Sequence, residues 1–255
     1  PKIHVVIEGA EFADYFWPAV EQYVECTHEY WRSNGKFVPN IVLRLASGGY
    51  IGGGLYHSQN IEGALATLPG ARIVCPSFAD DAAGLLRTAM RSRGFTLYLE
   101  PKALYNSVEA SSVVPEEFEV PFGKARIRRE GTDLSMITYG NTTHFCLNVA
   151  ERLAQEGWSV EVIDLRSLIP LDKETIYASV KKTSKALVVH EDKVFSGFGA
   201  EIAAGIGTEL FRYLDAPVQR VGSVFTPVGF HPILEKAILP TEDKIYDAAR
   251  TLLEY

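Results

Sequence analysis

Short apolar runs alternate along this chain with longer segments in which apolar residues recur every three or four positions. The runs are rich in Val, Ile and Leu and predict β-strands, and the recurring segments predict amphipathic helices. The predicted strands cover residues 3–7, 41–45, 72–75, 95–99, 134–139, 159–165, 185–191 and 217–221. The clearest predicted helices cover residues 16–31, 80–91, 142–156 and 241–253. This alternation predicts an α/β fold around a largely parallel sheet.

Local signals mark the ends of two predicted helices. Ser77 and Asp80 have the spacing of a capping box ahead of the helix at 80–91. Gly157 follows the helix at 142–156, and glycine is the usual residue just after a helix C-terminus. These signals support both helices independently of their apolar pattern.

The regular pattern fades in the middle of the chain. Pro115 and Pro121 lie on either side of an acidic cluster at 116–119, and such a stretch is typical of a connection between domains. We therefore predict two domains, residues 1–119 and residues 120–255.

Composition and charge exclude several classes of protein. The 255 residues include 25 Lys and Arg against 32 Asp and Glu, and the net charge of −7 argues against a nucleic-acid partner. Cys26, Cys75 and Cys146 are odd in number and form no C-x-x-C pair, so we predict neither a disulfide framework nor a zinc site. No apolar run reaches the ~18 residues of a membrane span, so we expect no membrane partner. The chain opens at Pro1 without Met, and we interpret it as a piece of a longer protein.

The candidate chemistry lies in "ASGGYIGGGLYHSQN", residues 46–60, where five glycines follow a predicted strand. No Gly-Lys-Ser/Thr follows, so this is not a phosphate-binding P-loop. The spacing is not G-x-G-x-x-G either, and a second candidate at Gly197 has Ile202 in place of its third glycine. Five glycines permit positive φ and close approach of the backbone, which would direct His57 into a cleft. The alternative is that His57 is a structural residue with satisfied hydrogen bonds.

The other histidines give weaker signals. His190 and Glu191 are neighbours on a predicted strand, so their side chains point to opposite faces and we interpret both as structural. His231 before Pro232 is typical of a helix entry, and His144 lies in the first turn of a predicted helix. We assign neither of these two histidines a catalytic role.

Six segments together resemble a known family. They are "EFADYFWPAVEQ", "GGGLYHSQ", "LPGARIVCPS", "DAAGLLRTAM", "LYLEPK" and "GFHPILEKAILPTEDKIYDAARTLL". The chain looks like the β subunit, or the β half of a fused chain, of the thiamine-diphosphate decarboxylase that opens 2-oxo acid dehydrogenase complexes. The "LYHSQ" block and "LYLEPK" are more similar to the branched-chain type than to the pyruvate type. The resemblance spans nearly the whole chain and implies a partial pyrimidine-binding domain followed by a transketolase C-terminal-like, three-layer α/β domain.

The resemblance implies roles for three residues. His57 matches the family's catalytic histidine, which lies beside the thiazolium carbon and manages protons on the substrate and during acyl transfer. Tyr15 matches an aromatic residue that packs near the aminopyrimidine ring. Glu11 occupies a position in the same pocket where the family often has Gln or Met. For Tyr15 the alternative is an ordinary core aromatic residue at the start of a helix.

The resemblance also implies what lies outside this chain. Thiamine diphosphate is activated in this family by a glutamate that precedes the position of Pro1. Its diphosphate and magnesium are held by the partner α subunit or α half. A monovalent-cation site of the family falls at residues 89–94, which keep none of the expected acidic or Asn ligands, so we assign no metal to this chain.

The implied partners are the α part, a second copy bound through the C-terminal domain, and a lipoyl acyltransferase core. The compartment is then the cytoplasm, or the mitochondrial matrix in a eukaryote. Residues 198–210 carry apolar residues at helical spacing with small residues between them, which indicates either a dimer interface or a helix packed on its own sheet.

Two functions remain open. The chain is either the β part of an active decarboxylase, or an inactive fragment that serves dimerisation and complex assembly. A serine hydrolase is disfavoured because the sequence contains no G-x-S-x-G elbow.

Overall fold

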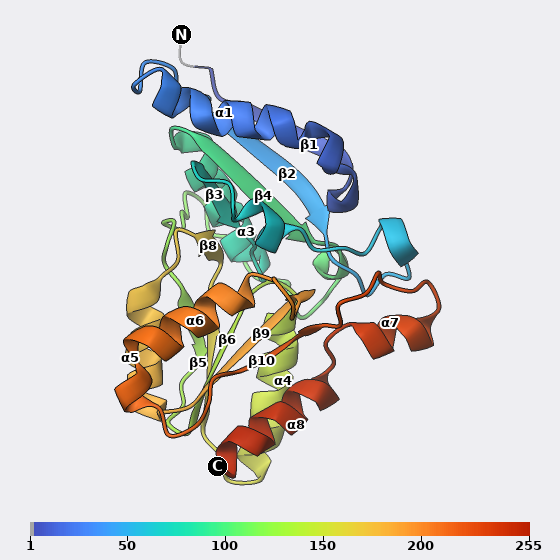
Figure 1. The fold of residues 1–255 in the computed structure, drawn as a ribbon, viewed down its shortest axis with the longest axis vertical. Coiled ribbons are helices and arrows are strands. Elements are labelled where there is room, and N and C mark those ends of the chain that lie inside the picture. Colours follow the sequence, from blue (N-terminus) through green and yellow to red (C-terminus); the bar gives the residue numbers. More distant parts are fainter. Residues whose placement is uncertain (1–2) are drawn as a thin grey trace.

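The computed structural model describes residues 3–255, with only the backbone of Ala10 and Glu11 described. The chain forms two five-stranded sheets, one above the other in Figure 1. The first sheet has the strand order β1-β2-β4-β3-β8, and the second has the order β10-β9-β6-β7-β5. Most neighbouring strands are parallel, which agrees with the α/β class predicted from the sequence.

The first sheet is covered by helices on both faces. Its strands are β1 (Val5–Phe12), β2 (Ile41–Ser47), β3 (Ala71–Val74), β4 (Phe95–Pro101) and the short antiparallel β8 (Ser167–Ile169). Its helices are α1 (Val20–Arg32), α2 (Glu62–Leu65) and α3 (Ala79–Arg91). Along β2, Val42 packs with residues of α3, whereas Leu43 packs with residues of α1 and α2. Successive strand residues thus supply the two opposite cores.

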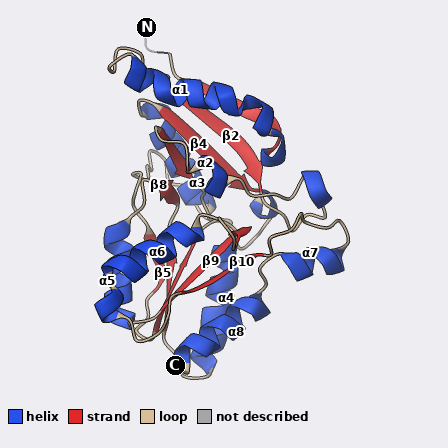
Figure 2. Ribbon diagram, in the orientation of Figure 1, coloured by secondary structure: helices blue, strands red, loops and turns tan. Residues whose placement is uncertain are grey.

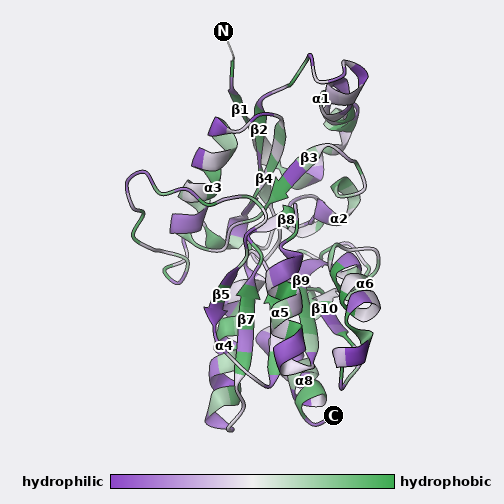
Figure 3. Cartoon of the chain, turned by 90° about the vertical axis from the view of Figure 1, so that its left-hand side faces the viewer, coloured by the Kyte–Doolittle hydropathy of each residue, from purple (hydrophilic) through white to green (hydrophobic). Residues whose placement is uncertain are grey.

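The second sheet is the centre of three layers. Its strands are β5 (Arg126–Arg129), β6 (Leu134–Thr138), β7 (Val160–Asp164), β9 (Ala186–Lys193) and β10 (Gln219–Ser223). One face carries α4 (Thr142–Gln155) and α8 (Glu242–Leu253). The other face carries α5 (Lys173–Thr183) and α6 (Gly199–Glu209). The short helix α7 (Pro232–Ile238) lies near the boundary with the first sheet (Figures 1 and 2). Met136 packs with α4 and α8, and Ile137 with α5 and α6. Figure 3 shows the resulting concentration of apolar residues on the strands.

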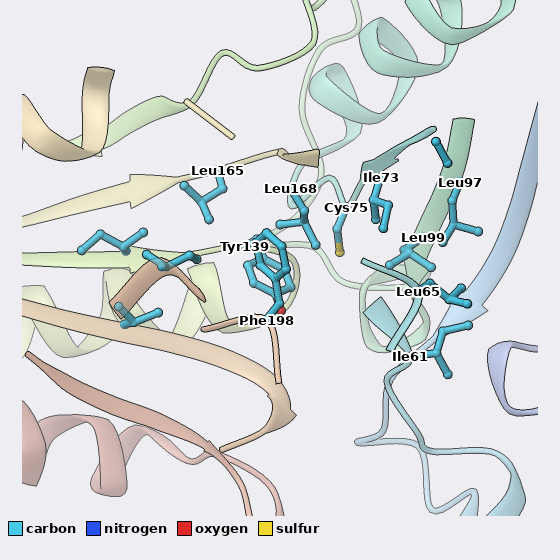
Figure 4. Packing of buried hydrophobic residues seen from close by; sticks show 14 of the residues in the cluster. Ile61, Leu65, Ile73, Cys75, Leu97, Leu99, Tyr139, Leu165, Leu168 and Phe198 are labelled. Atoms are coloured by element: carbon cyan, nitrogen blue, oxygen red, sulfur yellow. The ribbon is translucent and has the colours of Figure 1, made fainter. Parts of the chain in front are cut away.

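One core continues from the first sheet into the second. Figure 4 shows Cys75 and Leu168 on one side of the boundary close to Tyr139 and Phe198 on the other. Because the core is continuous, a residue at the end of a strand in one sheet can contact a loop of the other. The two halves therefore meet where the parallel strands end and where loops carry candidate functional residues.

All eight predicted strands are present, but β5 and β8 were not predicted. β5 has the sequence RIRR, which contains no apolar alternation, and β8 has only three residues. β8 comes from the second half of the sequence yet pairs with β3 of the first sheet. The boundary between residues 119 and 120 stays a prediction.

The predicted helices are confirmed, with two differences at their starts. The segment predicted from residue 16 begins with two 3-10 turns, and α1 itself starts at Val20. The predicted capping box is wrong: Phe78 is the N-cap residue of α3, and the buried Ser77 donates instead to Asp164 Oδ1 at 2.9 Å. The helix begins one residue later than the box requires, so Ser77 lies before the cap position and its hydroxyl binds a buried carboxylate of the second sheet. Gly157 has a φ of +95° just after α4, as its predicted role requires.

Within residues 3–255, no helix combines the length and the apolar character that crossing a bilayer would need.

Candidate active site

His57 lies on a loop that leaves β2 at Ser47 and leads to α2. The loop is closed at its base because Gly48 N donates to the Gln59 carbonyl at 3.2 Å. Gly48 has a φ of +87°, and a Cβ there would lie 2.5 Å from Glu191 Oε1. Gly53 is as closely packed, since a Cβ there would lie 2.7 Å from the His57 carbonyl oxygen. The glycines therefore provide the positive φ and the close approach predicted for them.

The ring of His57 lies close to two aromatic rings. Its centroid is 4.6 Å from that of Phe12 and 5.5 Å from that of Tyr15. The Tyr15 hydroxyl lies 3.4 Å from His57 Nδ1. Tyr15 is 43% exposed, so it is not an ordinary core aromatic residue. The structure thus brings together two of the three site residues expected from the sequence, and the side chain of Glu11 lies outside the described part.

Three carboxylates hold the backbone of this loop. Glu191, on β9, accepts a hydrogen bond from Gly49 N. Glu235, on α7, accepts one from Gly52 N at 3.2 Å. Asp14, in the 3-10 turn after β1, accepts one from Gln59 N at 3.0 Å. The loop that carries His57 is therefore fixed by groups from both sheets.

Lys102 is a nearby residue that the sequence analysis missed. It follows β4 and is buried, with its Nζ 4.3 Å from the centroid of the Phe12 ring. Nζ has no hydrogen-bond partner among the groups that the structure describes, which leave out the side chains of Ala10 and Glu11. Burial lowers the pKa of Lys102 to about 8, against the opposing charges of Asp14 and Glu191. In the sequence, Lys102 is the lysine directly after a predicted strand in "LYLEPK", and that segment served only to support the family resemblance.

Buried acids line the boundary between the sheets. Glu62 accepts hydrogen bonds from the Tyr139 hydroxyl at 2.9 Å and from Asn60 Nδ2 at 3.1 Å. Burial, and then the charge of Asp192, raise the pKa of Glu62 to about 7. Burial likewise raises the pKa of Glu191 to about 8. No pattern in the sequence pointed to Glu62 or Asp192, because their surroundings form only in the folded chain.

His190 has quite different surroundings from His57. Its ring is fully buried, and neither ring nitrogen has a hydrogen-bond partner within the described residues. Burial lowers the pKa of His190 to about 4. Gly197 and Gly199 pack against the ring, while the neighbouring Glu191 reaches the glycine loop. The two side chains do point in different directions, as their adjacency on a strand predicted.

His231 and His144 contact backbone groups. His231 Nδ1 accepts from Ile233 N at 3.3 Å at the start of α7, as predicted for a helix entry. His144 is buried in the first turn of α4 with its Nε2 2.7 Å from the Ser77 carbonyl oxygen.

A surface hollow of about 470 Å³ adjoins the loop. Leu55 and Tyr56, just before His57, form one side, and Phe225 with Pro227 forms the other. Leu55, Tyr56 and Phe225 are largely exposed. An exposed tyrosine beside a half-buried imidazole, next to an apolar hollow, fits one wall of a site for an aromatic cofactor and a small organic substrate.

The apolar stripe at residues 198–210 packs on its own sheet. Ile202, Ile206 and Leu210 are buried in the same cluster as Val188 of β9. This matches the alternative weighed for the stripe, so these residues do not themselves point to a dimer interface.

Comparisons with known proteins agree with this architecture. Residues 3–108 match the family model "Transketolase, pyrimidine binding domain", and residues 123–245 match "Transketolase, C-terminal domain". A solved structure described as a split gene transketolase in an inactive β4 tetramer has a similar fold, with a TM-score of 0.74 and 21% sequence identity, covering 98% of this chain and 75% of that one.

Curated relatives are more similar in sequence. The chain is 40% identical over 251 residues to the 2-oxoisovalerate dehydrogenase subunit beta of Bacillus subtilis, covering 98% of this chain and 76% of the relative. It is 38% identical over 253 residues to the mitochondrial 2-oxoisovalerate dehydrogenase subunit beta 2 of Arabidopsis thaliana, covering 98% and 70%. It is 39% identical over 225 residues to the pyruvate dehydrogenase E1 component subunit beta of Bacillus subtilis, covering 88% and 69%. The chain therefore belongs to the family of β subunits of the 2-oxo acid dehydrogenase decarboxylase component.

Proposed function

We propose that this chain is the β part of a thiamine-diphosphate-dependent decarboxylase that acts on a 2-oxo acid and passes the acyl group to lipoamide. The observation that carries the proposal is the contact between His57, on the glycine loop, and Tyr15, in the 3-10 turn after β1, whose hydroxyl lies 3.4 Å from His57 Nδ1. An imidazole held beside a phenol on a half-buried loop can donate and accept protons, which is the task that decarboxylation and acyl transfer require.

His57 acts through Nε2 in this proposal. We take the Tyr15 hydroxyl as the donor to Nδ1, 3.4 Å away, which would leave the proton of the neutral imidazole on Nε2. Nε2 is then the atom that exchanges a proton with the substrate. Phe12 packs against the ring, and we expect this contact to restrict the rotation of the imidazole.

The cofactor in this proposal is thiamine diphosphate with magnesium. When bound, it supplies an ylid carbon and an electron sink for decarboxylation. We assign His57, Tyr15 and Glu11 to the pocket around its rings, and the exposed ring of Tyr15 supports this because it leaves an aromatic face free for packing. We assign the diphosphate and the magnesium ion to the α part.

The substrate we favour is a branched-chain 2-oxo acid, with pyruvate as the alternative. The two relatives named for 2-oxoisovalerate align over 98% of this chain, and the relative named for pyruvate aligns over 88%. The apolar hollow beside His57 supports an apolar acyl chain.

The proposed partners are an α subunit or α half, a second copy of this chain, and a lipoyl acyltransferase core. Exposed apolar residues of the second half, including Phe230 and Ile233, support an interface there. Sedimentation equilibrium should give twice the 28.2 kDa mass of the chain at tens of micromolar. Ile233→Glu should shift this equilibrium toward monomer, whereas Gly207→Glu should not, because α6 packs on its own sheet.

Reconstitution with the α part tests the function. The full-length parent, assembled with its α part, thiamine diphosphate and magnesium, should convert 3-methyl-2-oxobutanoate and acylate a lipoyl domain, and pyruvate should react more slowly. An assembly that binds the α part and the acyltransferase core but converts neither acid would instead support the second function, a module for dimerisation and assembly.

A further inference from the structure

A second pocket lies at the opposite end of the first sheet from the His57 loop. It has a volume of about 370 Å³ and lies between the C-terminal half of α1 and the first residues of β3 and β4. The seven residues of β2 separate it from the His57 loop, which leaves the carboxyl end of that strand (Figure 1). Active sites of parallel sheets usually lie at the carboxyl ends of the strands, so this pocket has no place in the reaction proposed for His57.

Two arginines line this pocket without a counter-ion. Among the residues whose side chains the structure describes, neither Arg72 nor Arg93 forms an ion pair with a carboxylate. On the nearby part of α1, Glu29 pairs with Arg32 at 2.6 Å, and the exposed Glu25 does not line the pocket. In a chain with a net charge of −7, the pocket therefore has a positive wall that suits an anion.

The guanidinium group of Arg72 is held in place at this wall. Its Nε donates to Thr96 Oγ1 at 3.0 Å, and its Nη2 donates to the Arg93 carbonyl at 2.7 Å. Its central carbon lies 4.8 Å from the centroid of the Phe122 ring, and a Cβ at Gly94 would lie 3.6 Å from Nη2. A guanidinium has more N–H donors than these two bonds use, and its planar fork matches the oxygens of a phosphate or a carboxylate.

Two aromatic rings on α1 form the facing wall. Tyr30 and Trp31 line the pocket, with their ring centroids 5.6 Å apart and the rings perpendicular to each other. They are 46% and 68% exposed, so both keep ring surface in contact with water. A planar ring that stacks on such a surface gains contact with it and removes it from water. The pocket thus combines an aromatic wall with a cationic one.

We propose that this pocket binds a small anion that carries a planar aromatic ring, of the class of nucleoside monophosphates. Trp31 and Tyr30 hold the ring, and Arg72 and Arg93 hold the phosphate. The volume of about 370 Å³ is near the lower end of the usual range for small-molecule sites, which suits a mononucleotide better than a dinucleotide. This site is independent of the function proposed for His57.

Calorimetric titration of the full-length parent, assembled with its α part, measures this binding directly. Thiamine diphosphate and magnesium are kept saturating, so that the cofactor site is occupied. Adenosine monophosphate (AMP) should bind, whereas adenosine and inorganic phosphate should each bind much more weakly, because each offers only one of the two recognised groups. AMP should also quench part of the tryptophan fluorescence, and Trp31→Phe should reduce that quenching.

Substitutions at the exposed residues of the pocket separate binding from folding. Arg93→Gln should weaken AMP binding roughly 10- to 100-fold, and Trp31→Ala roughly 5- to 100-fold. Arg72→Lys keeps the charge but loses the planar fork, so it should also weaken binding. The matched controls are Arg91→Gln and Trp17→Ala, which change exposed residues of the same types outside the pocket and should bind AMP like wild type.

Three results would overturn the proposal. The first is no saturable binding of AMP to the wild-type assembly at millimolar concentration. The second is AMP binding that neither Arg93→Gln nor Trp31→Ala weakens, because the ligand would then lie elsewhere. The third is phosphate binding as tight as AMP binding, because the aromatic wall would then contribute nothing. An assembly that binds AMP as expected but converts no 2-oxo acid would support this site and contradict only the proposed function.

Discussion

The loop around His57 and the buried pocket around His190 use the same side chain for opposite purposes. His57 is half-buried on a glycine loop, has one nitrogen near a phenol and directly follows two residues that line a surface hollow. His190 packs against glycines and lies parallel to the ring of Tyr139, and neither of its nitrogens has a hydrogen-bond partner in the part of the chain that the structure describes. The two residues lie on either side of the boundary between the sheets.

The difference shows how a fold separates reactivity from packing. Glycines near His57 let the backbone bend and bring a side chain to the surface, whereas glycines near His190 remove side chains so that a ring can fit inside. Substitutions at the first site should therefore change turnover more than stability. Substitutions at the second should change stability and its dependence on pH.

The largest expected effect is on turnover. In the reconstituted enzyme, His57→Ala should lower turnover by ~10²–10⁴-fold, the usual contribution of general acid–base catalysis, while cofactor binding is kept. The matched control is His28→Ala, which removes an exposed histidine of α1. Turnover close to wild type in His57→Ala would contradict the assignment of this loop as the catalytic one.

The next effect is a change of stability with pH at His190. The pKa of His190 is about 4 in the folded chain, and it returns to its ordinary value of 6.5 when the chain unfolds. The unfolded chain therefore binds more protons than the folded chain between these two pH values. The stabilisation is complete above pH 6.5 and is lost as the pH falls to about 4, a change of roughly 3 kcal/mol at 1.36 kcal/mol per pKa unit.

His190→Gln isolates this effect from that of the acids. The pKa values of Glu62 and Glu191 are raised to about 7 and about 8. Their contribution to the free energy of unfolding therefore changes in the opposite direction and falls as the pH rises above 4.5, the ordinary pKa of glutamate. Both acids are present in wild type and in His190→Gln, so their contribution cancels when the two unfolding free energies are subtracted. Urea unfolding should show that difference shrinking from pH 7.5 to pH 4.5, and a constant difference would contradict the burial of a neutral imidazole.

A smaller loss is expected from filling the His190 pocket. In Gly199→Ala the new Cβ would lie 2.2 Å from ring atoms of His190, so the ring or the helix must shift. Overpacking of this kind costs about 1–3 kcal/mol. Urea unfolding at pH 7.5 measures it, and a stability equal to wild type would mean that the pocket has room the structure does not show.

The smallest effect has the opposite sign and lies on the same helix. A Cβ at Gly207 of α6 meets nothing within 4 Å. Gly207→Ala should therefore stabilise the chain by about 0.5–1 kcal/mol, because alanine loses less backbone entropy than glycine on entering a helix. A loss of stability in both glycine variants would show that α6 as a whole tolerates no change, rather than the His190 pocket alone.

The sequence predicted the elements better than the contacts between them. Met136 and Ile137 show why. Successive residues of a strand face opposite sides of the sheet, so the two side chains enter different cores and β6 could be predicted from its own residues. The bond between Gly49 and Glu191 joins residues 142 positions apart, and no local pattern predicts it. Ser77 was assigned wrongly for the same reason, because its acceptor Asp164 comes from the other sheet.

The candidate site was predicted in part. The glycines predicted a tightly bent loop that directs His57 into a cleft, and the family resemblance predicted that Tyr15 and His57 both lie beside the cofactor. The contact between Tyr15 and His57 themselves was not predicted. Lys102 and Glu62 were missed because a lysine or a glutamate is ordinary in sequence and becomes unusual only when burial changes its pKa. Their significance is a property of the folded boundary between the sheets.

Calorimetric titration of thiamine diphosphate tests most directly whether this chain supplies one wall of a shared site. With magnesium present, the isolated 255-residue chain should show no saturable binding at micromolar cofactor, and the full-length parent assembled with its α part should bind. Saturable binding to the isolated chain would contradict the division of the site between the two parts.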